Sequence, residues 1–269
     1  MYKMKKVSIR FKTPISYYGG KQKLAPKILA RIPEHLLYCE PFVGGAAIFF
    51  AKETSEIEVL NDTNKELINF YRVLQNRYVE LEKLINVTLH SRSLHKDASV
   101  IYNNPHLFDD VKRAWAVWVQ STQSFSAQLD SSWGFDVTGN TTTKKIQNNK
   151  ERFTQDYAIR MQNVQIENTD ALYIIQSRDA TTSFFYCDPP YINSDCGHYD
   201  GYTEGDFKRL LEVLSGIKGK FLLSSYPSEI LSSYIKKYAW HTASFEQGVS
   251  VAAKSGYRKR KVEVLSWNY

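Results

Sequence analysis

The stretch Ser183–Tyr191 (SFFYCDPPY) joins a short apolar run to a carboxylate, two prolines and a tyrosine. An apolar run of this length, bounded by turn residues, predicts a buried strand. Amphipathic segments follow other short apolar runs along the chain, and such alternation favours an α/β fold with a mostly parallel sheet. Ligands of open α/β sheets bind beyond the carboxyl ends of the strands, so we predict a binding site at Asp188–Tyr191.

The tetrapeptide that ends this strand offers acceptors on a rigid backbone. Pro189 and Pro190 have fixed φ angles and no N–H, which leaves carbonyl groups and the Asp188 carboxylate to face a ligand. An exocyclic amino group on a flat ring suits this corner, because it supplies two N–H donors and a face that can stack on Tyr191. A proline-terminated strand with an Asp turn and an exposed tyrosine is the alternative.

Two glycine motifs and one aspartate accompany other predicted strands and helices. The motif Glu40-Pro41-Phe42-Val43-Gly44-Gly45-Ala46 lies at the end of the apolar run that begins at Leu36, and its paired glycines allow a tight turn against a ligand. Asp62 ends the next predicted strand, where a carboxylate can accept ribose hydroxyls or cap the following helix. Tyr17-Tyr18-Gly19-Gly20-Lys21 precedes a short helical pattern near the N-terminus. Each of these motifs alone is also compatible with a plain turn.

The same patterns divide the chain into two parts. Predicted strands cover residues 36–42, 57–61, 183–187, 220–225, 239–245 and 261–267, and predicted helices cover 206–217 and a segment that starts with Pro227. Residues 74–162 contain few β-rich runs, and their apolar spacing around Trp115 and Trp118 is helical. We therefore predict a catalytic domain of residues 1–73 and 163–269 with a largely helical insertion. Within the insertion, the polar stretch 138–151 is predicted to be a loop.

Composition narrows the class of protein. The 269 residues include 35 Lys and Arg against 28 Asp and Glu, a net charge of +7, and 14% aromatic residues. Basicity with many flat rings is compatible with a nucleic-acid partner. Three cysteines form neither a disulfide framework nor a Cys-x-x-Cys zinc pattern, and no apolar run reaches the length of a membrane span. We therefore expect a soluble, cytoplasmic protein without a metal.

Taken in order, the motifs resemble those of one family, the Dam-like DNA adenine-N6 methyltransferases (D12 class, alpha group). In that family an aromatic-x-Gly-Gly-Lys motif is followed by Glu-Pro-Phe-x-Gly-Gly, an Asp after the second strand, a target-recognition insertion and Asp-Pro-Pro-Tyr. This chain has all of these in the same order. Asn168-Thr169-Asp170 matches an acidic position that contacts the adenine of the cofactor, and residues 257–263 resemble the last basic strand segment.

The resemblance implies a Rossmann-like S-adenosylmethionine-dependent methyltransferase sheet with a helical target-recognition insertion. It implies methyl transfer from S-adenosylmethionine to N6 of a flipped adenine in double-stranded DNA, by a protein that is a monomer in solution. The implied catalytic residues are Asp188, Pro189, Pro190 and Tyr191. The implied cofactor-binding residues are Tyr17, Lys21, Glu40, Phe42, Gly44, Gly45, Asp62, Asp170 and Asp188. The implied DNA-binding residues are Ser16, Phe125, Asp130, Trp133, Phe135, Arg258, Lys259 and Arg260.

Departures from the family pattern concern the recognised sequence more than the chemistry. Ser16 and Asp130 stand near positions where relatives that methylate GATC carry Lys and Arg, so we expect a different site. The basic cluster 258–261 is expected to contact phosphates, with a solvated edge strand as the alternative. Two other functions stay open: a methyltransferase for cytosine N4, RNA or protein glutamine, and a catalytically silent DNA-binding relative.

Overall fold

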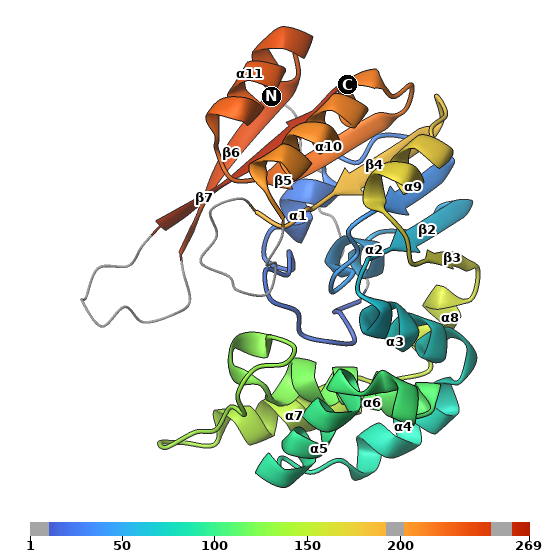
Figure 1. The fold of residues 1–269 in the computed structure, drawn as a ribbon, viewed down its shortest axis with the longest axis vertical. Coiled ribbons are helices and arrows are strands. Elements are labelled where there is room, and N and C mark those ends of the chain that lie inside the picture. Colours follow the sequence, from blue (N-terminus) through green and yellow to red (C-terminus); the bar gives the residue numbers. More distant parts are fainter. Residues whose placement is uncertain (1–10, 192–201, 249–259) are drawn as a thin grey trace. The chain divides into compact units, whose positions relative to one another are not determined.

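The computed structural model describes residues 11–191, 202–248 and 260–269. The chain divides into two compact units, Met1–Ala30 with Val43–Thr169, and Arg31–Phe42 with Asp170–Tyr269. Together their described residues contain seven strands, two in the first unit and five in the second (Figure 1). The mixed α/β fold expected from the alternating pattern is confirmed.

The second unit has a parallel core of three strands with an antiparallel pair beside it. β1 (Leu37–Glu40), β4 (Ser183–Cys187) and β5 (Lys220–Ser225) run parallel in that order. β7 (Arg260–Trp267) pairs antiparallel with β5 and with β6 (His241–Gly248). Every residue of β4 is buried. The helices of this unit are α9 (Ala171–Ser177), α10 (Glu204–Gly216) and α11 (Glu229–Tyr238).

The first unit pairs two parallel strands, β2 (Ile57–Asn61) and β3 (Val164–Glu167), and carries most of the helices. Two short helices, α1 (Ala25–Leu29) and α2 (Ala47–Ala51), precede β2. Between β2 and β3 the chain is helical, and Figure 1 shows most of these helices gathered in one bundle. They are α3 (Lys65–Asn76), α4 (Tyr78–Val87), α5 (Arg92–Asn103), α6 (Asp110–Gln123), α7 (Thr141–Glu151) and α8 (Asp156–Met161), with short turns η1 (Pro105–Leu107) and η2 (Phe125–Ala127).

Three local expectations were wrong or incomplete. The polar stretch 138–151 was expected to be a loop, but most of it forms α7, because Ile146 is buried to 3% exposure and anchors the helix. The α11 helix begins at Glu229 rather than Pro227, since the Ser228 side chain caps it by accepting from the N–H of Leu231. β3 was not anticipated, because its short sequence VQIE alternates without an apolar run.

The tryptophans of α6 pack among the helices between β2 and β3. Trp118 is fully buried, and the Trp115 indole donates to Thr88 Oγ1 at 2.7 Å. No helix in the described ranges is both long and apolar enough to cross a bilayer.

Candidate functional site

The acidic corner of the second unit lies where β4 ends. Asp188 is half-buried directly after the strand, and Pro189 behind it is buried. The hydroxyl of Tyr191 lies 3.0 Å from Asp188 Oδ1 and also contacts Oε1 of Glu263. The Tyr191 ring is 4.3 Å from that of Tyr226, at 59°. The strand end therefore holds a carboxylate and an aromatic ring that are linked to each other.

Glu263 comes to this corner from β7, and its contact with Tyr191 was not anticipated. β7 lies between β5 and β6, and Glu263 is only 6% exposed there although its side chain is ionisable. Burial, together with the nearby carboxyl groups of Asp188, Glu40 and Glu263, raises the pKa of Tyr186 far above its ordinary value. Three carboxyl groups therefore gather around one buried tyrosine.

Glu40 ends β1 beside β4. It is 2% exposed, and Oε1 accepts from the Tyr38 hydroxyl at 2.5 Å. In the parallel register Cys39 is opposite Phe185, which puts Glu40 level with Tyr186. Phe42, two residues further, is half-buried. Of the expected cofactor residues in this unit, Glu40 and Asp188 thus share the carboxyl ends of neighbouring strands.

The glycine turn of the first unit packs under an aromatic ring. Gly44 has φ of +46°, in the left-handed region that favours glycine. A Cβ added to Gly45 would lie 2.8 Å from Tyr17 Cβ, so no larger residue fits beneath Tyr17. Ala46, where the family usually has a third glycine, adopts φ of +53°. The Tyr71 hydroxyl donates to the Gly44 carbonyl at 2.7 Å and holds the turn from α3.

Asp62 connects this turn to the end of β2. Its Oδ2 accepts from the Gly44 N–H at 3.0 Å, and its Oδ1 accepts from the Asn64 N–H at 2.9 Å. Burial raises the pKa of Asp62, while the backbone N–H donors act in the opposite direction. The helix cap considered for Asp62 is instead Asn64, whose side chain accepts from Glu66 and Leu67. Tyr17, Gly44, Gly45 and Asp62 are therefore in one cluster.

Two asparagines that the sequence did not single out tie the end of β3 to this cluster. Asn61, fully buried, accepts from the Thr169 N–H at 3.0 Å and donates to its carbonyl at 3.1 Å. Asn168 donates to the Asp62 carbonyl at 2.7 Å. The next residue, Asp170, is exposed and caps α9 by accepting from Leu172 and Tyr173. A buried Asn at the last position of a strand is the signal that could have pointed to this tie.

Two other expected site residues, Ser16 and Lys21, lie near the N-terminus. The Lys21 ammonium group donates to the Gly19 carbonyl at 3.1 Å, and the residue is 7% exposed. Ser16 is half-buried next to Ile15, which is 1% exposed.

The helical part of the first unit, between β2 and β3, presents an aromatic pair with a cation over it. The rings of Trp133 and Phe135 stack at 5.5 Å and 17°. The Arg92 guanidinium carbon, from the start of α5, lies 4.6 Å from the Trp133 centroid and 5.4 Å from that of Phe135. Arg92 is exposed and has no ion-pair partner among the residues that the structure describes. No sequence motif pointed to Arg92, because it is a lone arginine that lies far from Trp133 and Phe135 along the chain.

Hydrogen bonds fix the loop that carries this pair. The Gly134 N–H donates to the Gln123 carbonyl at 2.7 Å, and Ser124 and Trp133 form an isolated antiparallel β-bridge. His90 Nε2 donates to the Gly134 carbonyl at 2.9 Å, which leaves Nδ1 to accept from Thr143 Oγ1. The rigid loop therefore holds Arg92 and its two rings in one arrangement.

The other expected DNA contacts differ in their surroundings. Phe125 is 60% exposed. Asp130 has φ of +55°, accepts from Asn103 Nδ2 at 2.8 Å, and donates its N–H to Gln120. Asp130 thus also holds its loop to α5 and α6. Arg258 and Lys259 lie outside the described residues, and of Arg260 only the backbone, in β7, is described.

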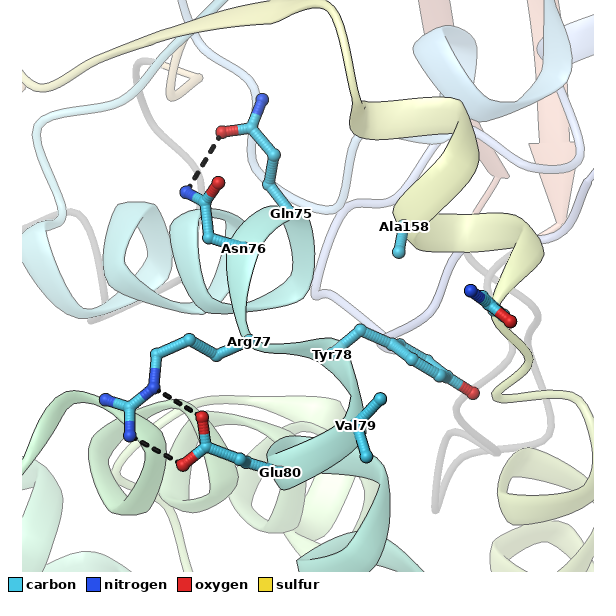
Figure 2. A pocket seen from close by; sticks show the side chains of 8 residues that line it. Gln75, Asn76, Arg77, Tyr78, Val79, Glu80 and Ala158 are labelled. Carbon is cyan, nitrogen blue, oxygen red and sulfur yellow. Dashed lines mark hydrogen bonds and ion pairs between the residues drawn. The ribbon is translucent and has the colours of Figure 1, made fainter.

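A pocket of about 290 Å³ lies at the junction of α3 and α4, lined also by Gln155 and Ala158 (Figure 2). Its polar groups are engaged with one another: Arg77 pairs with Glu80 through two hydrogen bonds. It contains none of the residues expected at a site. In the described part of the chain, no group of three or more His, Cys, Asp or Glu side chains could hold a metal ion.

Comparisons with known proteins agree with the motif order. Residues 17–247 match the family described as D12 class N6 adenine-specific DNA methyltransferase. The Type II methyltransferase M1.LlaDCHI of Lactococcus lactis subsp. cremoris is 25% identical over 99% of this chain and 98% of its own. The DNA adenine methylase of Escherichia coli K12 is 22% identical over 94% and 93%. The DNA N-6-adenine-methyltransferase of Escherichia phage P1 is 35% identical, over 36% of this chain and 13% of its own.

Proposed function

This chain belongs to the D12 class of N6 adenine-specific DNA methyltransferases, and on that premise we propose which residues bind the methyl donor, the adenine and the DNA. The protein is an adenine-specific DNA methyltransferase, and S-adenosylmethionine is its methyl donor. One observation supports the assignment of residues most directly. Asp188–Tyr191 lies at the carboxyl end of the fully buried strand β4, and the Tyr191 hydroxyl is hydrogen-bonded to Asp188.

The residues present fit S-adenosylmethionine. The turn at Gly44 and Gly45 has no side chains, so its backbone can approach a ligand closely. The Asp62 carboxylate beside this turn can accept hydrogen bonds from the ribose hydroxyls of the donor. We assign the donor to Tyr17, Gly44, Gly45 and Asp62, together with Lys21, Glu40, Phe42, Asp170 and Asp188. When bound, the donor supplies a methyl group that its sulfonium already activates.

Asp188 and Tyr191 act on the adenine. The base must leave the stack, because N6 cannot reach a protein pocket from inside a duplex. Asp188 and the Pro189 carbonyl accept hydrogen bonds from the amino group, which orients the nitrogen lone pair and stabilises the positive charge that develops on N6. Pro190 keeps this corner rigid, and Tyr191 stacks on the flipped ring.

The insertion, residues 74–162, supplies base contacts in double-stranded DNA. Arg92 is the residue best prepared for this, because its guanidinium is exposed, unpaired with any described acid and held by Trp133 and Phe135. A fixed guanidinium can bind guanine through O6 and N7 or a phosphate. Exposed Phe125 stands in the same loop. Arg258, Lys259 and Arg260 add phosphate contacts.

The recognised sequence contains adenine and is not GATC. Ser16 and Asp130 stand where relatives that methylate GATC carry cations, and Asp130 would repel the acceptors of guanine but can accept from cytosine N4. Single-molecule sequencing of DNA from a cell that lacks adenine methylation and expresses this protein tests the proposal. We expect one recurring motif other than GATC; GATC as the sole modified site would overturn the assignment of Ser16 and Asp130.

The same experiment separates the alternatives. A methyltransferase for cytosine N4 would mark cytosine. A methyltransferase for RNA or protein glutamine would leave DNA unmarked, as would a silent relative, and only the silent relative would still bind DNA without methylating any substrate. We propose further that the protein acts as a monomer in the cytoplasm, where bacterial and phage DNA is found. Its mass in solution, measured by light scattering with and without DNA, tests the oligomeric state.

A further inference from the structure

Asn64 joins three parts of the first unit at the start of α3, each through a different group. Its side-chain oxygen accepts from the backbone N–H groups of Glu66 and Leu67 at 3.0 Å and 3.1 Å. Its backbone N–H donates to Asp62 Oδ1 at 2.9 Å. Its side-chain nitrogen donates to the hydroxyl oxygen of Tyr102, on α5, at 3.0 Å. One asparagine therefore connects the cap of α3, the Asp62 carboxylate and a tyrosine of another helix.

The helix cap decides which way the Asn64 amide faces. Its oxygen must face the N–H groups of α3, because the amide NH₂ would face them donor to donor. The amide nitrogen therefore faces Tyr102, and the phenol accepts its hydrogen bond. Burial raises the pKa of Tyr102, with a smaller opposite effect from the bond to Asn64. Tyr102 thus remains a neutral phenol at neutral pH.

The orientation of the Asp62 carboxylate depends on two backbone donors from different segments. The Gly44 N–H donates to Oδ2 at 3.0 Å, and the Asn64 N–H donates to Oδ1 at 2.9 Å. Donors on both oxygens fix the plane of a carboxylate, and this plane sets where its other lone pairs point. A shift of Asn64 would therefore turn the carboxylate relative to ribose hydroxyls placed against it.

Resting on the proposed function, in which Asp62 binds the ribose of the methyl donor, we propose that Tyr102 is a positioning residue for the donor. By accepting from the Asn64 amide, Tyr102 holds the Asn64 N–H at Asp62 Oδ1 and keeps the carboxylate in the plane that suits the ribose. The helix that carries Tyr102 begins at Arg92, which the proposed function assigns to DNA. One helix thus serves both the donor and the DNA.

Two ligands separate this role from a general loss of stability. S-adenosylhomocysteine, the donor without its methyl group, carries both ribose hydroxyls, and an analogue of it lacks both. The wild type should bind the first about tenfold more tightly at neutral pH, because hydrogen bonds to a charged group are the stronger ones. Tyr102→Phe deletes only the phenol oxygen, so this preference should fall about threefold while affinity for the analogue stays unchanged. Isothermal titration calorimetry measures both dissociation constants.

A second variant removes the same bond from its other end. Asn64→Ser lacks the amide nitrogen but keeps an oxygen at the cap, since serine is also a favoured N-cap residue. It should lower the preference as much as Tyr102→Phe, and the double variant should lose no more than either single variant. It also tests the bond if Tyr102→Phe does not fold. Tyr78→Phe is the matched control: it removes a hydroxyl that donates to the Phe153 carbonyl at 2.8 Å, and it should keep both affinities.

A wild-type preference in Tyr102→Phe would overturn the proposal. So would an equal loss of affinity for both ligands, since that would show a general effect on the fold. If the wild type bound both ligands equally, Asp62 would not bind the ribose, and the proposal would fall with that assignment. The expected binding pattern in a protein that methylates no adenine would support the proposal and count against the proposed function alone.

Discussion

The backbone N–H of Gly44 donates to Oδ2 of Asp62 at 3.0 Å, and this bond joins the turn after β1 to the end of β2. The turn is also closed from within, because the Ala46 N–H donates to the Val43 carbonyl at 2.7 Å. Tyr17 covers the same glycines. A loop, a strand end and an N-terminal aromatic residue thus form one unit, and its geometry depends on the absence of side chains at two positions.

Gly45→Ala should weaken S-adenosylmethionine binding at least tenfold. The new Cβ would lie 2.8 Å from Tyr17 Cβ, which cannot rotate away, so the turn or Tyr17 must shift. Isothermal titration calorimetry measures the dissociation constant. Gly216→Ala is the matched control, because nothing lies within 4 Å of its added Cβ at the end of α10. An unchanged affinity in a folded Gly45→Ala protein would exclude the glycine turn from the donor site.

Arg92→Ala should reduce affinity for the specific DNA site by about 1–3 kcal/mol, the range for a bidentate contact with guanine. Arg92→Lys should recover little of it, because an ammonium group lacks the planar fork that stacks on Trp133. Fluorescence anisotropy measures the affinity for the specific duplex and for an unrelated duplex. Lys96→Ala, at another exposed position of α5, should change neither affinity. Full affinity in Arg92→Ala would remove this residue from the DNA interface.

Neutralising Arg258 and Lys259 should weaken binding to all DNA sequences alike. The slope of log affinity against log salt should fall by about 0.9 for each phosphate contact that is lost. Titrations at several salt concentrations measure the slope, with Lys236→Ala/Lys237→Ala on α11 as a control of equal charge change. If both double variants keep the wild-type slope, the basic cluster contacts solvent only.

The insertion should lose stability in mild acid through His95. This residue is 4% exposed, and its Nε2 lies 2.8 Å from Ser124 Oγ. Burial lowers the pKa of His95, against the opposite effect of Asp130. The unfolded chain therefore binds the proton more readily, and the free energy of unfolding falls as pH drops below about 6.5, the ordinary value for histidine.

His95→Gln should reduce that dependence, because it keeps a polar group near Ser124 without a site for the proton. Urea unfolding of both proteins at pH 7.5 and pH 5.5 measures the difference in stability between the two conditions. The wild type should lose more than the variant on acidification. Equal losses would mean that other groups account for the acid sensitivity.

Strands with continuous apolar runs were predictable from the sequence, and the glycine turn and Asp188–Tyr191 follow two of them. Residues 183–187 and 220–225 form β4 and β5 over the predicted ranges because burial on both faces requires apolar residues throughout. β3 and α7 escaped prediction, since one is short and the other has Ile146 as its single buried residue.

The contacts that orient the site residues could not be read from local patterns. Glu263 lies 72 residues from Tyr191 along the chain, and the contact between them depends on β7 pairing with β5. Arg92 likewise has no motif around it, and only folding of the segment between β2 and β3 brings it over Trp133. Long-range pairing of single polar residues leaves no periodic trace in a sequence. The division into a catalytic domain and an insertion at residues 74 and 162 stays a prediction.

The central claim is that Asp188 promotes methyl transfer to adenine N6, and mass spectrometry of nucleosides tests it most directly. DNA is incubated with the protein and S-adenosylmethionine, digested, and compared with DNA treated with Asp188→Ala. We predict N6-methyladenine from the wild type, at least a hundredfold less from the variant, which corresponds to the loss of about 3–4 kcal/mol of transition-state stabilisation, and nearly unchanged DNA affinity. N4-methylcytosine as the product, or more than a tenth of the wild-type rate in Asp188→Ala, would contradict the account.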